Sequence, residues 1–375
     1  MISLETSHII SQLSALEPAE QAYQHLYVAN PYDDIDPVSS WDDFEEHYRQ
    51  LAAKEYISFP DAPISDIATR FYEHQFFSQP APLLSDFTAD QMNELIYPPH
   101  MDSGVVAFKH LRYLPPFLHS LEFVKLVYVV SGRCYFYLKG QKRMIPAGGL
   151  IIVGPNVQQA FYANHDEDLV INVIMRRSTF ENAFSPLLME RNQISDFFWQ
   201  MLYVKNFSHV LLFQCNADSE IKKLLLNLYA ESQLEPNKSL IIMNSYVLLL
   251  FGQLIRYHLD QVQSLTGDAH KHTISLILRY IRNNYQTADL SMLAQHFNLS
   301  KGYLSRYIKA ETGYSFSALL QQLRMKEAAD ILKNSSISIE EIVASVGYTD
   351  ISNFYRKFKL LFGTTPSEFR KHYRE

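Results

Sequence analysis

The spacing of apolar residues divides the chain into segments of different structure. Between residues 105 and 175, short apolar runs are separated by tight turns such as Ser131-Gly132 and Gly148-Gly149. Short strand-like runs with such turns between them are typical of a small barrel or sandwich. The predicted strands are VVAFKHL, FVKLVYVV, RCYFYL, KRMI, GLIIV, QAFYA and LVINVIM. We therefore predict a β domain over residues 101–178.

Helical spacing follows this β domain. Over residues 179–263, segments such as IKKLLLNLYAES and LIIMNSYVLLLFGQLIRYHL place apolar residues three and four positions apart, which is the period of an α-helix packed on one side. Their apolar faces are wide enough for a helix pair or a dimer interface, so we predict a helical dimerisation or connecting region. Residues 264–272 are polar and contain Gly267, and we expect them to be the linker to a domain over residues 273–375.

Charge is distributed unevenly along the chain. The overall net charge is −7, but residues 1–100 carry −14 and residues 273–375 carry +5. A basic segment of this kind suits contact with the phosphates of DNA. The acidic first hundred residues are also rich in aromatic residues, among them Trp41 and Phe71, whereas disordered acidic tails are poor in them. We predict folded, mostly helical structure there, divided by prolines.

The last hundred residues contain the same unit twice. A shift of 49 residues superimposes four positions of the first copy on apolar or turn positions of the second: Leu293, Ala294, Phe297 and Asn298 on Ile342, Val343, Val346 and Gly347. After one inserted residue, a shift of 50 superimposes six more: Leu304, Arg306, Ile308, Lys309, Gly313 and Ser317 on Phe354, Arg356, Phe358, Lys359, Gly363 and Ser367. Apolar residues match apolar residues, and two basic pairs and two glycines are retained.

Each copy has the local signals of a helix-turn-helix. We predict the first over about residues 291–311 and the second over about 339–362, separated by one helix at residues 315–332. Asn298 and Gly347 occupy the turns, where the backbone needs a left-handed residue. One chain with two such units can address two successive major-groove faces of a DNA duplex.

Capping residues set the helix boundaries. Ser300 can cap the second helix of the first unit. Ser338-x-x-Glu341 has the pattern of a capping box at the start of the second unit. The second helix of that unit is capped by Thr349 or Asp350. Glycines able to end the second helices follow at Gly313 and Gly363.

These residues closely resemble the AraC-type family of bacterial transcription regulators. The resemblance covers about residues 273–373, and its most specific parts are LAQHFNLSKGYLSRYIKAETGYSF, LRMKEAADIL and IVASVGYTDISNFYRKFKLLFGTTPSEFR. It implies an all-α DNA-binding domain with two recognition helices. Double-stranded promoter or operator DNA is then the expected partner.

The resemblance also implies which side chains face the bases. The matching positions are Lys301, Gly302, Ser305 and Arg306 in the first recognition helix, and Ile351, Ser352, Asn353 and Arg356 in the second. Arginine suits the O6 and N7 acceptors of guanine and asparagine suits adenine, whereas glycine and isoleucine offer little hydrogen bonding. Base reading should therefore concentrate on Ser305, Arg306, Ser352, Asn353 and Arg356. Lys309 and Lys359 are expected at phosphates.

The β segment resembles the cupin-like effector barrel that is common in this family. In catalytic cupins, two histidines, a glutamate and a later histidine hold a metal, and the matching positions here are His119, Leu121, Lys125 and Gln159. Of these four positions only His119 keeps a metal ligand, and the ammonium of Lys125 would repel a cation. We therefore expect no metal and no catalysis. Lys125 and Gln159, with His119, could instead contact a hydroxylated effector. The alternative is that Lys125 is solvent-exposed and Gln159 only terminates a strand.

Composition excludes other classes of protein. Polar residues interrupt every apolar run before the roughly 20 positions that a membrane span needs. The N-terminus lacks the basic start of a secretory signal. Two cysteines, Cys134 and Cys215, are too few for a disulfide framework or a zinc site. We expect a cytoplasmic protein with no membrane association and no cofactor.

Together these patterns predict an α+β multidomain protein, with a cupin-like β-barrel and a helical region followed by the all-α DNA-binding domain. The favoured function is a sequence-specific transcription regulator modulated by a small molecule, with sugar or another carbon source suggested by the resemblance alone. A homodimer is expected, and RNA polymerase is a candidate partner. Two alternatives stay open: a ligand-independent regulator whose barrel serves only dimerisation, and a cupin enzyme fused to a DNA-binding module.

Overall fold

The computed structural model describes residues 6–29 and 104–372, apart from positions 115, 117, 122, 177–178, 181–183, 185–186, 189–191, 206, 217, 235–238 and 267–268, together with the single positions 31 and 37. The chain forms two compact units. The first comprises Met1–Met201 and Phe207–Thr266, and the second comprises Leu202–Asn206 and Gly267–Glu375.

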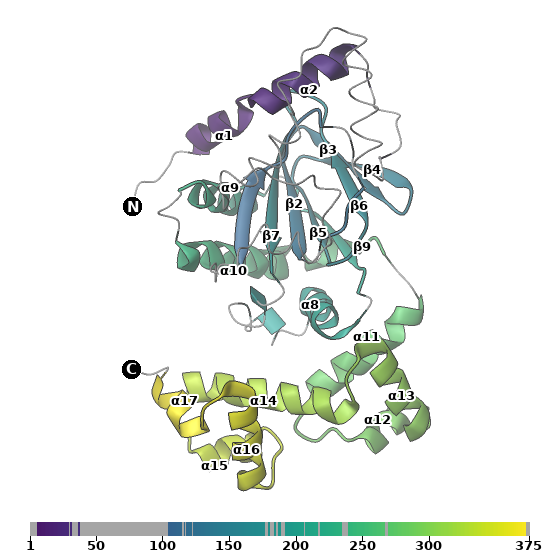
Figure 1. Ribbon diagram of the computed structural model, residues 1–375, viewed down its shortest axis with the longest axis vertical. Helices are drawn as coiled ribbons and strands as arrows, with labels where there is room; N and C mark the ends of the chain where they lie inside the picture. Colours follow the sequence, from purple (N-terminus) through teal and green to yellow (C-terminus); the bar gives the residue numbers. More distant parts are fainter. Residues whose placement is uncertain are drawn as a thin grey trace, which may run out of the picture. The chain divides into compact units, whose positions relative to one another are not determined.

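Two β-sheets form the centre of the first unit (Figure 1). The larger has six strands in the order β1-β7-β2-β5-β8-β9, and the smaller has the order β4-β3-β6. The pairs are antiparallel. The strands are β1 (Val105–Lys109), β2 (Val124–Ser131), β3 (Arg133–Leu138), β4 (Gln141–Pro146), β5 (Gly149–Val153), β6 (Gln159–Tyr162), β7 (Leu169–Met175), β8 (Val210–Gln214) and β9 (Val262–Ser264).

Alternate residues of these strands build one hydrophobic core between the two sheets. Val127 and Val129 of β2 contribute from the larger sheet, and Phe136 of β3 and Phe161 of β6 contribute from the smaller one. The rings of Phe136 and Phe161 stack with their centroids 4.7 Å apart. Successive strand residues point to opposite faces, so this set follows directly from the period of two in the sequence.

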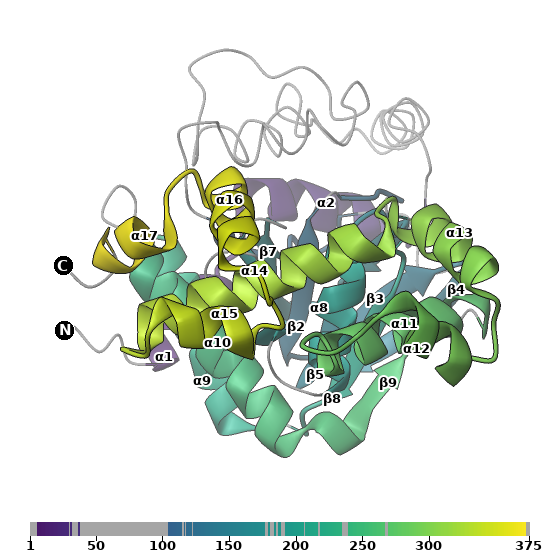
Figure 2. The same cartoon turned by 90° about the horizontal axis from the view of Figure 1, so that it is seen from below.

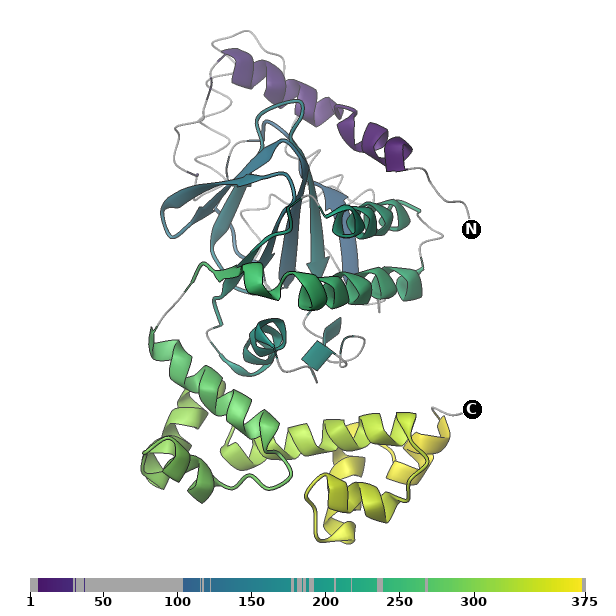
Figure 3. The same cartoon turned by 180° about the vertical axis from the view of Figure 1, so that it is seen from behind.

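The helices of the first unit are α1 (Thr6–Ser14), α2 (Pro18–Ala29), α8 (Gln193–Tyr203), α9 (Ser219–Ser232), α10 (Leu240–Tyr257) and the short 3-10 helix η2 (Leu259–Gln261). Figure 3 shows α9 and α10 side by side next to the β1 edge of the larger sheet. The Ser232 hydroxyl accepts from the Ala107 backbone N–H at 3.1 Å, and the Gln233 side-chain amide donates to the Ala107 carbonyl. These bonds satisfy backbone groups on the outer edge of β1, which would otherwise be open to another chain.

Helix α10 is apolar on two sides. Its buried residues are Met243, Val247, Leu250, Phe251 and Leu254. Its exposed apolar residues are Ile241, Ile242, Leu249 and Tyr257. By length and composition α10 could cross a membrane. The interrupted apolar runs of the sequence are therefore not sufficient to exclude a membrane-spanning helix. One such helix is weak evidence for a membrane, because the core helix of a soluble protein can meet the same test.

The second unit contains seven helices among the described residues. They are α11 (Ala269–Asn283), α12 (Leu290–His296), α13 (Lys301–Thr312), α14 (Phe316–Asn334), α15 (Ile339–Ser345), α16 (Ile351–Phe362) and α17 (Pro366–His372). Figure 2 shows α14 running between the two helix-turn-helix units, with α13 near one end and α15 and α16 near the other. The 19 residues of α14 correspond to roughly 28 Å at 1.5 Å per residue.

The seven predicted strands are present as β1–β7, and the α+β class with an all-α C-terminal domain is confirmed. The boundary at residue 178 is wrong, because β8 and β9 lie within or beside the part that helical spacing suggested and both join the larger sheet. The expected linker 264–272 is shorter, since β9 ends at Ser264 and α11 begins at Ala269. Helices α1 and α2 agree with a helical start, whereas residues 38–103 lie outside the described residues.

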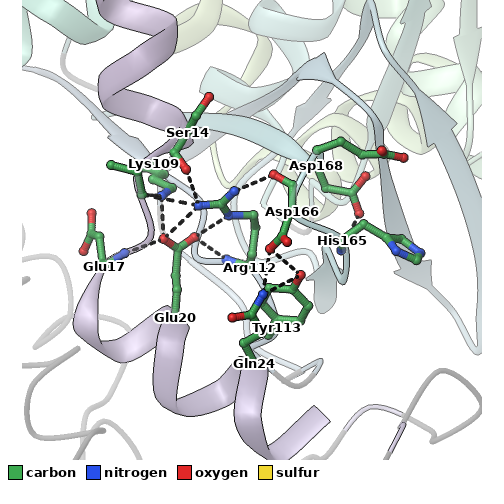
Figure 4. Close-up of polar contacts among 12 residues, drawn as sticks. Ser14, Glu17, Glu20, Gln24, Lys109, Arg112, Tyr113, His165, Asp166 and Asp168 are labelled. Atoms are coloured by element: carbon green, nitrogen blue, oxygen red, sulfur yellow. Dashed lines mark hydrogen bonds and ion pairs between the residues drawn. The ribbon is translucent and has the colours of Figure 1, made fainter. Parts of the chain in front are cut away.

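A buried carboxylate attaches α2 to the larger sheet. Glu20 of α2 and Arg112, which follows β1, are almost completely buried, and Arg112 Nε donates to Glu20 Oε1 at 2.9 Å. Lys109, the last residue of β1, donates to Glu20 Oε2 (Figure 4). Burial raises the pKa of Glu20, but the hydrogen bonds from Arg112 and Lys109 outweigh it and hold the pKa below its ordinary value.

The same two basic residues also bind backbone carbonyl groups. Arg112 Nη2 donates to the carbonyl of Ser14 at 3.0 Å, and its Nη1 donates to the carbonyl of Asp166. Lys109 Nζ donates to the carbonyl of Ala15 at 2.8 Å. The end of α1, the first turns of α2 and the loop before β7 are therefore joined by one set of charge-assisted hydrogen bonds.

Glu20→Ala should lower the free energy of unfolding by roughly 3–5 kcal/mol, because it leaves two buried cations without their counter-charge. Urea denaturation at pH 7 measures this loss. Since the folded-state pKa of Glu20 is lowered, its stabilisation is present at neutral pH and is lost as the pH falls through that pKa. The difference in free energy of unfolding between wild type and Glu20→Ala should therefore become smaller at acidic pH.

Gln21→Ala is the matched control, because Gln21 is an exposed residue of the same helix. It should change the free energy of unfolding by less than about 0.5 kcal/mol. An equal loss in both variants would mean that the helix itself, and not the carboxylate, supplies the stability.

Candidate nucleic-acid interface and ligand site

The first helix-turn-helix consists of α12, a left-handed turn and α13. Asp289 caps α12, with its carboxylate accepting from the backbone N–H of Met292 at 2.9 Å. Asn298 has φ 53° and makes the turn. Ser300 caps α13 and Gly313, with φ 82°, ends it. The predicted turn, cap and end of this unit are confirmed, and the cap at Asp289 starts α12 one residue earlier than expected.

The second helix-turn-helix repeats this backbone with different residues. Ser338 and Glu341 form the predicted capping box of α15. Gly347 has φ 81° and makes the turn. Of the two candidate caps for α16, the structure uses Asp350, whose carboxylate accepts from the backbone N–H of Asn353 at 3.1 Å. Gly363, with φ 76°, ends the helix. The duplication therefore extends to backbone conformation.

Gly347 has a second reason to be glycine. A Cβ at this position would lie 2.1 Å from the carbonyl oxygen of Gln286, in addition to the strain of its positive φ. Arg324 of α14 donates to that carbonyl at 2.9 Å and to the carbonyl of Tyr285 at 2.7 Å. Arg324 therefore joins α14 to the backbone before α12.

One side of each recognition helix is buried and the other is exposed. Leu304 and Ile308 of α13, and Phe354 and Phe358 of α16, are fully buried. The exposed candidate DNA contacts are Lys301, Gly302, Arg306 and Lys309 on α13, and Ile351, Ser352, Arg356 and Lys359 on α16; Ser305 and Asn353 are half-buried. Arg306 and Arg356 lie opposite the core residues of their helices, as the period of 3.6 requires, whereas Lys301 and Ile351 are exposed as the first residue of each helix, on the side that carries the core.

Two of the candidates on α16 are hydrogen-bonded to each other. Arg356 Nη2 donates to Asn353 Oδ1 at 3.1 Å, and both side chains lie on the same face, three residues apart. This bond holds a guanidinium next to a carboxamide at the exposed face of the helix. Guanidinium and carboxamide groups suit the edges of guanine and adenine in the major groove.

Polar residues of the first unit lie inside the core between its sheets. Lys125 of β2 is 5% exposed, so the alternative that it is solvent-exposed is wrong. Its Nζ lies 4.7 Å from the centroid of the Phe161 ring. Gln159 is 1% exposed and begins β6 instead of ending a strand. His119 is half-buried and pairs with Gln159 through two backbone hydrogen bonds of 2.9 and 3.0 Å.

The structure adds two residues that sequence reasoning did not assign to this group. Asn172 of β7 is buried, and its Nδ2 lies 3.4 Å from Nδ1 of His110, the residue after β1. Burial, together with the charge of Lys125, lowers the pKa of His110 to about 3, so its imidazole is neutral. A polar residue within the otherwise apolar run LVINVIM was the available signal for Asn172. Leu121 instead packs with Phe123 in a separate apolar cluster.

Lys125→Met should stabilise the unliganded protein. Burial lowers the pKa of Lys125 to about 8, so below pH 8 the folded chain carries a charge that its surroundings disfavour. The cost at pH 7 corresponds to about 3 kcal/mol, from 1.36 kcal/mol per pKa unit. Because the unfolded chain stays protonated to about pH 10.5, this cost should fade between pH 8 and 10.5.

Denaturation of wild type and variant across pH 7–10.5 measures this difference. Lys142→Met is the control, because Lys142 also lies over an aromatic ring, that of Tyr135, but is exposed on β4. Its stability difference from wild type should show no comparable pH dependence. If the stability difference between wild type and Lys125→Met does not change across pH 7–10.5, Lys125 is not a destabilising buried ammonium.

Comparison with known proteins places the second unit in a family. A family model described as a helix-turn-helix domain matches residues 293–372. YfiF of Bacillus subtilis, named as an HTH-type transcriptional regulator, is 28% identical over 268 residues, covering 69% of this chain and 80% of that protein. The transcriptional activator RhaR of Mannheimia succiniciproducens is 23% identical over 277 residues, covering 72% of this chain and 94% of that protein.

A third relative matches over a shorter stretch. The raffinose operon transcriptional regulatory protein RafR of Pediococcus pentosaceus is 30% identical over 132 residues, which covers 35% of this chain and 47% of that protein. The chain thus spans about half of that relative and most of the other two. The second unit, with its duplicated helix-turn-helix, therefore contains a helix-turn-helix domain of the AraC-type family of transcription regulators.

Proposed function

We propose that this protein binds a specific DNA site with both recognition helices and that a small molecule bound in the first unit modulates this activity. The observation that carries the proposal is the duplicated helix-turn-helix, with matching caps and left-handed turns at Asn298 and Gly347. Two recognition helices joined by the rigid helix α14 can contact successive stretches of one major groove.

We assign base reading to the exposed face of each recognition helix. Arg306 on α13 and Arg356 on α16 are repeat partners, and each is exposed about one turn after its helix begins. Asn353 is held beside Arg356 by their hydrogen bond. Lys309 and Lys359 lie three residues further along, where the phosphate backbone is the closer target. The net charge of +5 over residues 273–375 supports phosphate contact.

The effector is proposed to be related to carbohydrate or to another carbon source. RafR, a relative over about a third of this chain, is named as a regulator of a raffinose operon. Buried polar side chains between the two sheets, Lys125, Gln159 and Asn172, give the first unit groups that could bind such a molecule. The proposed role requires no catalysis. Contact with DNA implies a cytoplasmic location, and RNA polymerase is a candidate partner.

A second copy of the chain is proposed to cover the exposed side of α10. Ile241 is 80% exposed and Leu249 is 55% exposed, eight residues apart and therefore on similar sides of the helix. Gly252 lies in open space on the same helix, so another helix could approach closely there. A homodimer would bury these apolar side chains, so that they are removed from water without a membrane.

DNA binding is tested with a cognate site selected from a random DNA library. Arg356→Ala should cost roughly 1–3 kcal/mol on this site and much less on random DNA, because it removes a contact to base edges. Lys359→Ala should weaken cognate and random DNA alike and reduce the salt dependence by about one ion, because it removes a phosphate contact. Fluorescence anisotropy at several salt concentrations measures both.

Equal losses on both DNAs for both variants would show that the groove-facing side of α16 has been assigned wrongly. Thermal denaturation of each variant is the control for folding, since both side chains are exposed. Failure to select any preferred site with the wild-type protein would contradict sequence-specific binding altogether.

The dimer is tested by Ile241→Glu combined with Leu249→Glu. Two charges placed in the proposed interface should convert a dimer to a monomer, because burying an unpaired carboxylate costs several kcal/mol. Sedimentation velocity measures the mass. Leu360→Glu is the control, since Leu360 is 84% exposed on α16 in the second unit and should leave the oligomeric state unchanged. A double variant that remains a dimer contradicts this interface.

A further inference from the structure

Several buried polar groups of the first unit lack the partners that such groups normally have, and four of these side chains lie in the same part of the core. The Lys125 ammonium faces the Phe161 ring and has no ion pair or hydrogen bond among the described residues. Gln159 Oε1, Asn172 Oδ1 and His110 Nε2 are buried and have no hydrogen-bond partner there either. More than nine-tenths of buried polar groups in native proteins are paired. Four unpaired groups in one place therefore indicate a binding site.

These groups gather in the same part of the core. Lys125 and Asn172 come from the neighbouring strands β2 and β7, on the face that carries core residue Val127. Gln159 lies on β6 of the opposite sheet, two residues before Phe161 and on the same face. His110 contacts Asn172 at 3.4 Å, and its ring centroid is 6.5 Å from that of Phe161. The two sheets thus present these side chains to each other.

The hydrogen-bonding character of each group can be assigned. The Asn172 amide nitrogen donates to His110 Nδ1, so the proton of this neutral imidazole is on Nε2, which becomes an unpaired donor. The Lys125 ammonium is a second donor. Gln159 Oε1 and Asn172 Oδ1 are unpaired carbonyl acceptors. A complementary molecule must therefore accept hydrogen bonds at one part and donate them at another.

The lysine adds a requirement for charge. A buried ammonium without a counter-ion is costly, and its contact with one aromatic ring offsets only part of that cost. A hydroxyl group can accept a hydrogen bond from Lys125 but cannot neutralise its charge. A carboxylate does both, and its second oxygen can accept from His110 Nε2. A carboxylate cannot donate to Gln159 or Asn172, so hydroxyl groups are needed for these two.

We propose that the effector is a small hydroxylated carboxylic acid of the sugar-acid type, whose carboxylate binds Lys125 and His110 and whose hydroxyl groups donate to Gln159 and Asn172. This inference rests on the proposed effector function of the first unit and narrows it from carbohydrates in general to their acids. Neutral sugars lack the charge that the site requires.

Thermal denaturation of the full-length protein tests the proposal, with sodium D-gluconate and sodium D-galacturonate as acidic probes and D-glucose and D-galactose as their neutral counterparts. Sodium acetate supplies a carboxylate without hydroxyl groups. An acidic probe should raise Tm by roughly 5–10 °C at about one hundred times its Kd. The matching neutral sugar should bind at least about tenfold more weakly, because a charge-assisted pair is missing.

Lys125→Met should abolish the response to the acids while the protein remains folded. Gln159→Met should weaken it by removing a hydroxyl partner. Lys142→Met, which alters an exposed lysine over a tyrosine ring, should respond as wild type does. The proposal is supported if the response is lost in Lys125→Met, weakened in Gln159→Met and unchanged in Lys142→Met.

Three results would overturn it: no shift with any acidic probe, an equal shift with the neutral sugars, or a full response in Lys125→Met. Acetate as effective as the sugar acids would overturn the role of the hydroxyl groups. DNA binding to the selected site is measured on the same preparations. If DNA binding is intact and neutral sugars give the response, the sugar-acid proposal is wrong and the proposed DNA-binding function stands. If DNA binding is absent, the proposed function itself is wrong.

Discussion

Exclusion of water from its buried interior is the constraint on which the first unit depends. Any polar group placed there loses its hydration and must find another partner. Glu20 does so completely, because Arg112 and Lys109 donate to both of its oxygens. Lys125 does not, since an aromatic ring is its nearest described partner. The first arrangement is complete within the protein, whereas the second is completed only by something that binds to it.

The second unit is constrained by backbone geometry. Its two copies differ in sequence, yet a left-handed residue makes each turn and a left-handed glycine ends each recognition helix. The exposed positions have diverged, with Lys301 in one copy where Ile351 stands in the other. The turn fixes the angle between the helices, so it cannot change without loss of the fold. The exposed face can change freely, and different faces allow the two copies to read different bases.

Local signals explain what could be predicted from the sequence. Caps such as Ser300 and Ser338 bind backbone atoms within three residues, so the pattern alone identifies them. Strand β8 could not be recognised, because its place in the sheet depends on pairing with β5, about sixty residues earlier. The pairing of His110 with Asn172 could not be predicted for a similar reason. Only the register of β1 against β7 brings the two side chains to the same face.

The unpaired groups in the core also supply the free energy that regulation needs. A ligand changes an equilibrium only by the difference in its affinity for the two states. In the unliganded protein, the ammonium of Lys125 and the carbonyl of Asn172 destabilise the arrangement of strands that surrounds them. A complementary ligand removes that cost only when β2, β6 and β7 have this arrangement. The residues that destabilise the unliganded protein are therefore the same residues that make ligand binding stabilise one conformation of the first unit.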